Sequence, residues 1–301
     1  ALCSLDFVVV HEQVMTATAR YADIVLPINT HFERNDIIRP WQGESYCIYM
    51  NKVIEPLHES KSDIEVCRML APRLGIETYG EMSDDEWLRD FWREAENMTH
   101  GEELPDYDSF KQMGIHRMQR PKPTIAFENL DGDKPFPSPS GKIEIYSSTI
   151  AERNQPDLPP ITMYIEPDEG PGQAGSGPYP LQLISTHSKR RIHSNMHTVG
   201  WLRDLEPHTV WINSADAGER GICDGDRVRV FNDRGTVEIA ARVTGRIMPG
   251  VVSMGQGAWY QPDEKGVDQG GCVNVLLKDR HSPAGAFCSN SCLVQIEKEK
   301  K

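Results

Sequence analysis

One stretch decides the fold of the second half of this chain: Arg227-Val228-Arg229-Val230-Phe231-Asn232-Asp233-Arg234-Gly235-Thr236-Val237-Glu238-Ile239-Ala240. Apolar and polar residues alternate on both sides of its centre, which is typical of two half-buried strands. Asn232-Asp233-Arg234-Gly235 supplies turn residues between the two runs, so the stretch predicts a β-hairpin. Asp224-Gly225-Asp226, directly before it, predicts a further turn.

Further short apolar segments surround this hairpin. They predict strands at residues 181–185, 210–212, 251–254 and 293–296. Residues 215–220 predict one short helix, which Gly221 ends. Many short strands with few helices indicate a small closed barrel.

The first part of the chain predicts α/β structure instead. The apolar runs Phe7–Val10 and Ala22–Leu26 are typical of buried strands, and Pro27 ends the second run. Ser62–Glu65 and Ser83–Glu86 are capping boxes, and each opens a predicted helix. The helical spacing predicts buried faces made of Ile64, Cys67, Leu70, Ala71 and Leu74 in the first helix, and of Trp87, Leu88, Phe91 and Ala95 in the second. Strands followed by helices indicate part of an open α/β sheet.

Composition marks the domain boundaries. From Pro121 to Pro180 frequent prolines break any long element, and only residues 141–146 alternate like a strand. Gly170–Gly177 has the composition of a linker. We therefore expect an α/β domain over residues 1–155, a linker over 156–178 and a barrel domain over 179–301.

Charge and cysteine content exclude several classes of function. The formal net charge of -13 argues against a general nucleic-acid binder. No window holds the roughly 20 apolar residues that cross a bilayer. The 7 cysteines are scattered without a C-x-x-C motif, so an iron–sulfur or structural zinc site has no local support. The chain begins without Met and without a secretory signal, and we expect a fragment or a processed piece.

A short basic segment, Thr186–Asn195, is the strongest candidate site. Its sequence, Thr-His-Ser-Lys-Arg-Arg-Ile-His-Ser-Asn, contains three consecutive cations and two imidazoles, and it follows a predicted strand. Arg side chains bind phosphate oxygens bidentately, while His and Ser add further donors. The residues alone leave two interpretations open: a loop that binds a phosphorylated ligand, or a solvated basic turn.

Other patterns carry less information. His193 and His197 are four residues apart, as zinc ligands on a helix are, but Ser194 stands where metalloproteases have Glu, and no third ligand follows. Gly255–Trp259 and Gly270–Asn274 allow close approach of a ligand, or form a bulge or turn. Within the second stretch, Asn274 either bonds a heterocycle or caps a turn. The possible carboxylate pairs, Glu33 with Asp36 or with Asp23, are common on surfaces.

Several ordered motifs resemble the molybdopterin oxidoreductases of the dimethyl sulfoxide reductase family. They cover nearly the whole chain, and they are Tyr21–Pro27, Phe32–Asp36, Ser138–Ser147, Thr209–Asn213, Asp224–Val228, Val251–Ser253, Gln256–Tyr260 and Gly266–Leu276. The last of these is most similar to catalytic subunits of respiratory dimethyl sulfoxide reductases. The resemblance implies a partial Rossmann-like α/β domain, followed by a small closed β-barrel of the double-psi type that binds a dinucleotide.

The resemblance also implies a cofactor, a molybdenum held by two molybdopterin guanine dinucleotides. The expected cofactor-binding residues are Thr186, His187, Ser188, Arg190, Arg191, His193, Ser194, Gly271 and Asn274 in the barrel domain, and Thr16 and Thr18 in the first domain. Cys288-Ser289-Asn290-Ser291-Cys292 departs from the family, because relatives usually carry His or Asn there.

The activity that the resemblance implies is reduction of an S- or N-oxide by oxygen-atom transfer. The family's metal ligand and its 4Fe-4S cysteines lie in an N-terminal half, so this chain is expected to be a C-terminal, cofactor-binding portion without turnover of its own. The expected partners are that N-terminal part, an iron–sulfur electron-transfer subunit and a membrane anchor subunit, with no nucleic acid. Relatives are often exported by a twin-arginine signal to the extracytoplasmic face of the membrane; otherwise the protein is cytoplasmic.

Two alternatives remain open from the sequence. One is a stand-alone or split-subunit module that binds the dinucleotide without redox activity. The other is a zinc hydrolase that uses His193 and His197.

Overall fold

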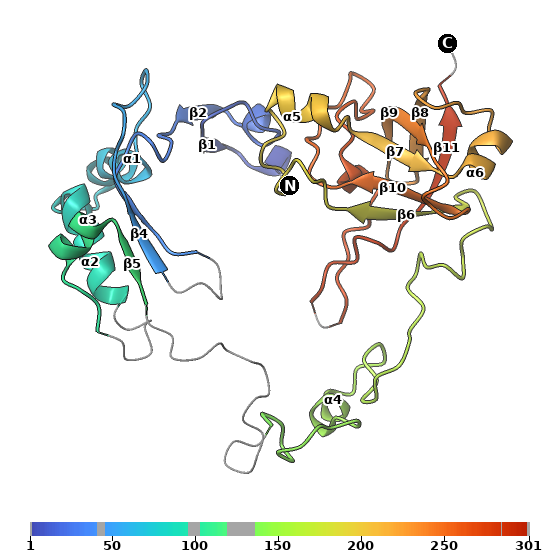
Figure 1. Ribbon diagram of the computed structural model, residues 1–301, viewed down its shortest axis with the longest axis horizontal. Coiled ribbons are helices and arrows are strands. Elements are labelled where there is room, and N and C mark those ends of the chain that lie inside the picture. Colours follow the sequence, from blue (N-terminus) through green and yellow to red (C-terminus); the bar gives the residue numbers. More distant parts are fainter. Residues whose placement is uncertain (1, 41–45, 96–102, 119–135, 284, 300–301) are drawn as a thin grey trace. The chain divides into compact units, whose positions relative to one another are not determined.

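The computed structural model describes residues 2–40, 46–95, 103–118, 136–283 and 285–299 (Figure 1). The chain divides into two compact units, Ala1–Glu128 and Asn129–Lys301. The boundaries expected at residues 155 and 178 remain predictions, and each unit is described by itself.

The second unit contains a closed barrel of six strands, as the sequence predicts. The strands are β6 (Leu181–Thr186), β7 (Thr209–Ile212), β8 (Arg227–Asn232), β9 (Gly235–Val243), β10 (Val251–Gly255) and β11 (Leu293–Lys298). Their order around the barrel is β10-β6-β11-β8-β9-β7. The sheet is mixed, because β10 runs parallel to β6 and β7 runs parallel to β9, whereas the other neighbours are antiparallel.

The predicted hairpin forms two neighbouring strands of the barrel wall. Strands β8 and β9 pair in the register Val228↔Ile239 and Val230↔Val237, and all four side chains are buried in the barrel core. Since successive residues of a strand point to opposite faces, the alternation in the sequence fixes which side chains fill the core. The turn is tight, and the amide of Arg234 donates to Asn232 Oδ1 over 3.0 Å.

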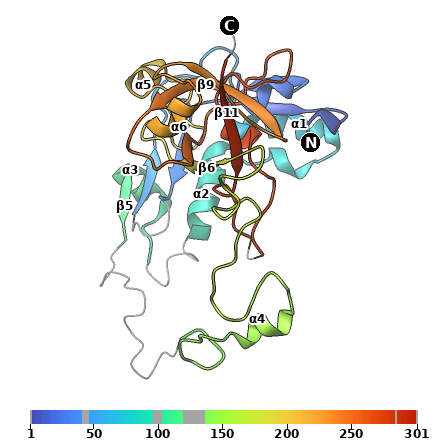
Figure 2. The ribbon, with the colours of Figure 1, turned by 90° about the vertical axis from the view of Figure 1, so that its right-hand side faces the viewer.

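Short helices lie on this barrel. The predicted helix is α6 (Ser214–Glu219), and its N-cap Asn213 accepts a hydrogen bond from the amide of Ala215. Arg220, at its end, donates to Gln295 of β11, so the helix lies against that strand (Figures 1 and 2). Helix α5 (Gly200–Leu205) and the 3-10 helix Val273–Val275 were not predicted.

The proline-rich segment before the barrel has little regular structure. Its described residues, from 136 onward, contain one short helix, α4 (Ser148–Arg153). The strand predicted over residues 141–146 is wrong, because only Tyr146 makes a β-bridge, to Ile161. Apolar alternation there has no neighbouring strand to pair with, and Ile143 and Ile145 are exposed.

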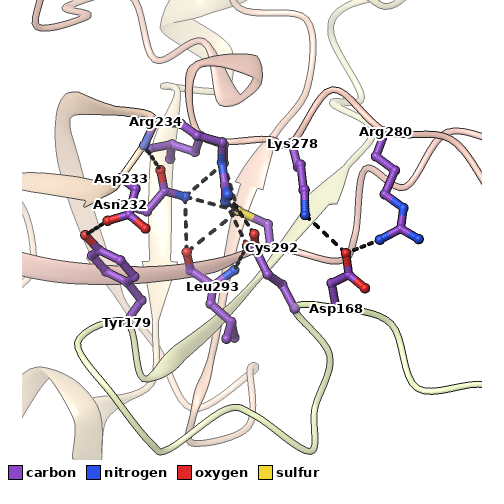
Figure 3. Close-up of polar contacts among 11 residues, drawn as sticks. Asp168, Tyr179, Asn232, Asp233, Arg234, Lys278, Arg280, Cys292 and Leu293 are labelled. Carbon is purple, nitrogen blue, oxygen red and sulfur yellow. Dashed lines mark hydrogen bonds and ion pairs between the residues drawn. The ribbon is translucent and has the colours of Figure 1, made fainter.

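Part of this segment is fastened to the barrel by ion pairs (Figure 3). The Glu169 carboxylate accepts two hydrogen bonds from Arg234, at 2.6 and 2.8 Å, and a third from the amide of Leu293 at 2.9 Å. Asp168 pairs with Lys278 and Arg280. The Tyr179 hydroxyl donates to Asp233 in the β8–β9 turn. The residues from Asp168 to Tyr179 therefore belong structurally with the barrel.

The first unit confirms the predicted α/β character. Strand β1 (Val9–Glu12) pairs in parallel with β2 (Ile24–Pro27), and a separate antiparallel sheet, absent from the prediction, contains β3 (Asp36–Ile38), β4 (Tyr46–Met50) and β5 (Ile115–Arg117). The helices are α1 (Asp63–Leu70), α2 (Asp84–Ala95) and α3 (Tyr107–Met113). An aromatic core joins α2 and α3, where Trp92 stacks on Phe110 with 3.7 Å between ring centroids.

Both predicted helix starts are confirmed, although the buried faces differ from the prediction. Ser62 caps α1, and Ser83 caps α2 with a reciprocal bond from its own amide to the Glu86 carboxylate. Helix α1 buries Val66 rather than Leu70, and Leu74 is 71% exposed. Helix α2 buries Trp92, while Phe91 is 47% exposed. Helical spacing identifies an apolar stripe, but it does not identify which side of the stripe this unit covers.

Candidate anion-binding site

A cavity of about 240 Å³ lies against strands β6, β10 and β7 on the outside of the barrel. On β7 and β10 the lining residues Thr209, Trp211, Ser253 and Gly255 alternate with residues of the barrel core. The basic segment and the residues before β7 complete the lining, together with Arg242 of β9; they are Thr186, His187, Ser188, Lys189, Arg191, Glu206, Pro207 and His208. The cavity therefore opens where the end of β6 passes into the basic segment.

The lining of this cavity is cationic in an otherwise acidic chain. Lys189, Arg191 and Arg242 line it with a single carboxylate, that of Glu206. The Arg242 guanidinium lies 5.0 Å from the centre of the Trp211 ring, which holds it over the strand. Thr186 and Ser253 add hydroxyl groups, 3.3 Å apart. Such a lining suits an anion with several oxygen atoms.

Arg191 is the most deeply placed of these cations. Its Nη2 donates to the Gln256 carbonyl over 3.0 Å, and burial lowers the pKa of the guanidinium. Its Nε is buried without a hydrogen-bond partner. A charged donor left unsatisfied is costly, and a ligand oxygen would satisfy it once the guanidinium turns towards the cavity, since Nε itself has almost no exposed surface.

The basic segment is folded tightly against the loop after β10. His193 and Met196 have left-handed backbones, with φ of 52° and 68°. The Trp259 indole donates to the Ser194 carbonyl over 2.9 Å. Gly257 has φ of 86°, and a Cβ there would lie 1.8 Å from the His193 carbonyl oxygen, so only glycine fits. The side-chain nitrogen of Gln256, Nε2, lies 2.9 Å from His187 Nδ1 and 3.3 Å from His193 Nδ1.

The predicted site residues separate into several groups. Thr186, His187, Ser188 and Arg191 line the cavity together. The others in the barrel lie outside its lining: Arg190, His193 and Ser194 are exposed in the segment, Gly271 lies behind His208, and Asn274 is exposed on a 3-10 helix. Thr16 and Thr18 belong to the first unit, where the Thr16 hydroxyl accepts from the Ala19 amide.

Sequence reasoning missed several lining residues. Ser253, Trp211 and Arg242 lie on strands that are distant in sequence from the basic segment. The sequence shows only that each of these three residues faces outward on a strand of alternating apolar and polar residues. Finding them requires knowing that β10 lies between β6 and β7.

The structure does not support the zinc site or the catalytic carboxylate pair that the sequence left open. Among the described residues no group of three or more His, Cys, Asp or Glu side chains is arranged to hold a metal ion. His197 is buried and stacked on Trp259, and burial, with nearby Arg191, lowers its pKa to about 4. Glu33 accepts hydrogen bonds from Thr30, Leu57 and Ser60, which lower its pKa to about 2 and make it a poor base.

Comparisons with known proteins agree with this geometry. The family described as "Molydopterin dinucleotide binding domain" matches residues 181–292, and the family "Molybdopterin oxidoreductase" matches residues 1–73. Strands β6 to β10 of the barrel lie within the region that matches the molydopterin dinucleotide-binding domain. The chain is therefore similar to molybdopterin oxidoreductases in its first part and to molydopterin dinucleotide-binding domains in its second.

Two curated relatives illustrate the similarity. Dimethyl sulfoxide reductase DmsA of Escherichia coli is 40% identical over 310 residues, which are 97% of this chain and 38% of that protein. A dimethyl sulfoxide/trimethylamine N-oxide reductase of Cereibacter sphaeroides is 36% identical over 316 residues, 98% of this chain and 38% of that protein. The chain therefore spans well under half the length of these relatives.

A solved structure shares the fold. Acetylene hydratase from Pelobacter acetylenicus superposes with a TM-score of 0.74 at 23% identity, covering 99% of this chain and 41% of that one. At this identity the likeness shows the fold alone.

None of the helices among the described residues has the length and apolar character needed to span a membrane.

Proposed function

We propose that the barrel binds a molybdopterin dinucleotide, with the pyrophosphate of the ligand in the cavity beside β6 and β10. The observation that carries this proposal is Arg191, a half-buried guanidinium in the cavity lining whose Nε has no hydrogen-bond partner. Its only carboxylate neighbour in the lining, Glu206, makes no hydrogen bond to it among those described. A diphosphate supplies the oxygen atoms that this donor needs.

Other residues of the cavity fit the same ligand. Lys189 and Arg242 add charge for the second phosphate, and the hydroxyls of Thr186 and Ser253 add neutral donors. Gly255 exposes bare backbone to the cavity, where a Cβ would lie 3.3 Å from Arg191 Nη2. Asn274 and the other exposed residues of the basic segment are assigned to the heterocyclic ends of the ligand, in accordance with the sequence prediction.

The wider activity that we propose is reduction of an S- or N-oxide, with this chain as a C-terminal, cofactor-binding portion of the catalytic subunit. The names of the relatives, dimethyl sulfoxide and trimethylamine N-oxide reductases, support it. Bound molybdenum would supply the two-electron chemistry of oxygen-atom transfer. The residues of this chain bind and orient the organic part of the cofactor and exclude water from its phosphates.

The proposed cofactor is the guanine dinucleotide form, in two copies, and a 4Fe-4S cluster is assigned to the part of the relatives that this chain does not span. The proposed partners are that remaining part of the catalytic subunit, an iron–sulfur subunit and a membrane anchor subunit. The proposed location is the extracytoplasmic face of the membrane.

Exposed apolar side chains of the first unit support a polypeptide partner. Phe7 and Phe32 are 61% and 63% exposed, and Val9 and Ile24 are exposed on the paired strands β1 and β2. Large apolar groups gathered on a surface usually mark a contact with another protein segment. The relatives are long enough to provide one, because 62% of the Escherichia coli protein lies outside the matched region.

Titration of the 301-residue chain with inorganic pyrophosphate, followed by calorimetry, tests the binding proposal. Arg191→Ala is expected to weaken binding by at least about tenfold, since a hydrogen bond to a charged group contributes about 1.5–3 kcal/mol. Arg190→Ala is the matched control, because it removes the same charge from the neighbouring exposed position, and we expect a change below about threefold. Equal losses in the two variants would show that the cavity is not the binding site.

A further inference from the structure

His208 lies between the two parts of the proposed site. Its Nε2 is 2.9 Å from the Gly271 carbonyl oxygen, and its Nδ1 is 3.3 Å from Arg191 Nη2. Arg191 belongs to the basic segment and Gly271 to the loop before the 3-10 helix Val273–Val275, 80 residues further along the chain. One imidazole ring therefore connects two distant stretches of sequence.

The contacts determine the tautomer of this ring. A carbonyl oxygen only accepts hydrogen bonds, so Nε2 must carry a proton to bond Gly271. Burial lowers the pKa of His208, although the Gly271 carbonyl opposes that effect, and nearby Arg191 lowers the pKa further. The ring is therefore neutral at pH 7, and Nδ1 is an acceptor. Its partner is the Arg191 guanidinium, which only donates.

The position of the ring depends on the glycine at position 271. A Cβ on Gly271 would lie 2.4 Å from His208 Cδ2, too close for the ring to stay in place, whereas a Cβ on Gly255 would be in ordinary contact with the ring at 3.6 Å. Gly271 has φ of 82°, a conformation that side-chain-bearing residues rarely adopt. Any other residue at position 271 would therefore displace the imidazole from its place beside Arg191.

A buried carboxylate holds the Gly271 carbonyl in place. Asp268 is fully buried, and its two oxygens accept hydrogen bonds from the amides of Gln261, Gly270 and Cys272 at 2.6, 3.2 and 2.6 Å. These bonds fix the turn in which Gly271 lies. The contacts form one continuous series: Asp268 orients the turn, Gly271 orients His208, and His208 orients Arg191.

We propose that His208 is the positioning residue of the anion cavity: it holds the Arg191 guanidinium in the orientation that meets the ligand and couples the Gly270–Leu276 loop to the basic segment. This inference rests on the proposed function for its ligand. The ring is also part of the cavity lining, and the role proposed for it here acts through its contact with Arg191.

Two substitutions separate the two halves of this role. His208→Asn keeps an oxygen acceptor near the position of Nδ1 and loses the donor to Gly271. His208→Gln keeps a donor near Nε2 and loses the acceptor for Arg191. For binding of inorganic pyrophosphate to the 301-residue chain, we expect His208→Asn to stay within about threefold of wild type and His208→Gln to fall by about tenfold. Equal affinities of the two variants, whether both high or both low, would overturn the proposal.

A second measurement needs no ligand. In chain labelled with ¹⁵N-histidine, the His208 ring is expected to show the neutral tautomer protonated at Nε2, and Arg191→Met is expected to shift the Nδ1 resonance downfield by removing its donor. A His208 ring protonated at Nδ1, or an Nδ1 resonance unchanged in Arg191→Met, would overturn the proposal. If wild type fails to bind pyrophosphate, the proposed function fails, and this spectrum still decides the role of His208.

A matched pair of glycine variants tests the packing. Gly271→Ala is expected to weaken pyrophosphate binding at least tenfold, because the new methyl group occupies the space of the imidazole. Gly266→Ala introduces the same left-handed alanine at φ of 79° with nothing within 4 Å of the new Cβ, and it is expected to bind like wild type. Equal affinities of these two variants would contradict the positioning of His208 by Gly271.

Discussion

At the scale of single residues, the ionisable groups of the described chain differ in how completely they are hydrogen-bonded. Asp268 and Glu33 each accept several hydrogen bonds from their surroundings. Arg191 is different, because its Nε is buried without a partner. Completed bonds indicate a structural role, whereas an incomplete one at the edge of a cavity indicates a ligand.

Glu33 gives a prediction about pH. Its folded-state pKa of about 2 lies below the ordinary 4.5, chiefly because Thr30 and Leu57 donate to it. The stability that it contributes is therefore fully present above about pH 4.5 and is lost as the pH falls towards 2. Glu33→Gln is expected to lower the thermal midpoint of the first unit at pH 7 and to reduce its fall between pH 4.5 and 2.5.

Near-ultraviolet circular dichroism of the aromatic core of the first unit follows that transition. Glu59→Gln, at an exposed position nearby, is the control and is expected to leave the midpoint close to wild type. A Glu33→Gln midpoint that falls with pH as steeply as wild type would show that Glu33 does not stabilise this unit.

The sequence predicted the site only as far as local patterns extend. The basic segment was found because its cations are consecutive, and Thr186, His187, Ser188 and Arg191 do line one cavity. Adjacent arginines cannot be told apart by composition, and only the structure separates the half-buried Arg191 from the exposed Arg190. His208 and Arg242 come to the site through strand pairing, which a local pattern does not contain.

At the scale of elements, strand alternation was the most informative signal. The β8–β9 hairpin was predicted together with its buried valines, because its turn and its period agree. Helix caps were also predicted, since Ser62 and Ser83 act locally. The buried faces of these helices were predicted only in part. Ala71 is buried and Leu88 and Ala95 pack against the aromatic core, but Leu70, Leu74 and Phe91 are exposed, because burial depends on packing partners far along the chain.

The contact of Glu169 with the barrel gives a prediction at this scale. Glu169→Gln removes the charge that Arg234 binds, so the segment and the ends of β8 and β11 should loosen together (Figure 3). Burial alone would raise the pKa of Glu169, but the bonds from Arg234 and Leu293 lower it, so the carboxylate is charged at neutral pH. We expect a cost of about 1–3 kcal/mol to local stability.

Hydrogen exchange of the β8 and β11 amides measures this cost, and the amides are expected to exchange about tenfold faster or more in Glu169→Gln. Asp168→Asn is the matched control, because it alters an adjacent carboxylate whose ion pairs are more exposed. Exchange rates as slow in Glu169→Gln as in wild type would show that the segment is not held by this ion pair.

At the scale of the whole molecule, the chain contains a six-stranded barrel that we propose binds the cofactor, and a separate α/β unit. It spans 38% of the Escherichia coli relative, and it exposes large apolar side chains such as Phe7 and Phe32. The central claim is that this portion holds the dinucleotide through Arg191, while the chemistry belongs to a longer assembly.

The most direct test is the amount of pterin and nucleotide released by acid from the 301-residue chain, purified from a host that makes the molybdenum cofactor. The account predicts that wild type releases both in roughly equal molar amounts and that Arg191→Ala releases at least about tenfold less of each. Wild-type chain without bound nucleotide, or equal release from Arg191→Ala, would contradict it.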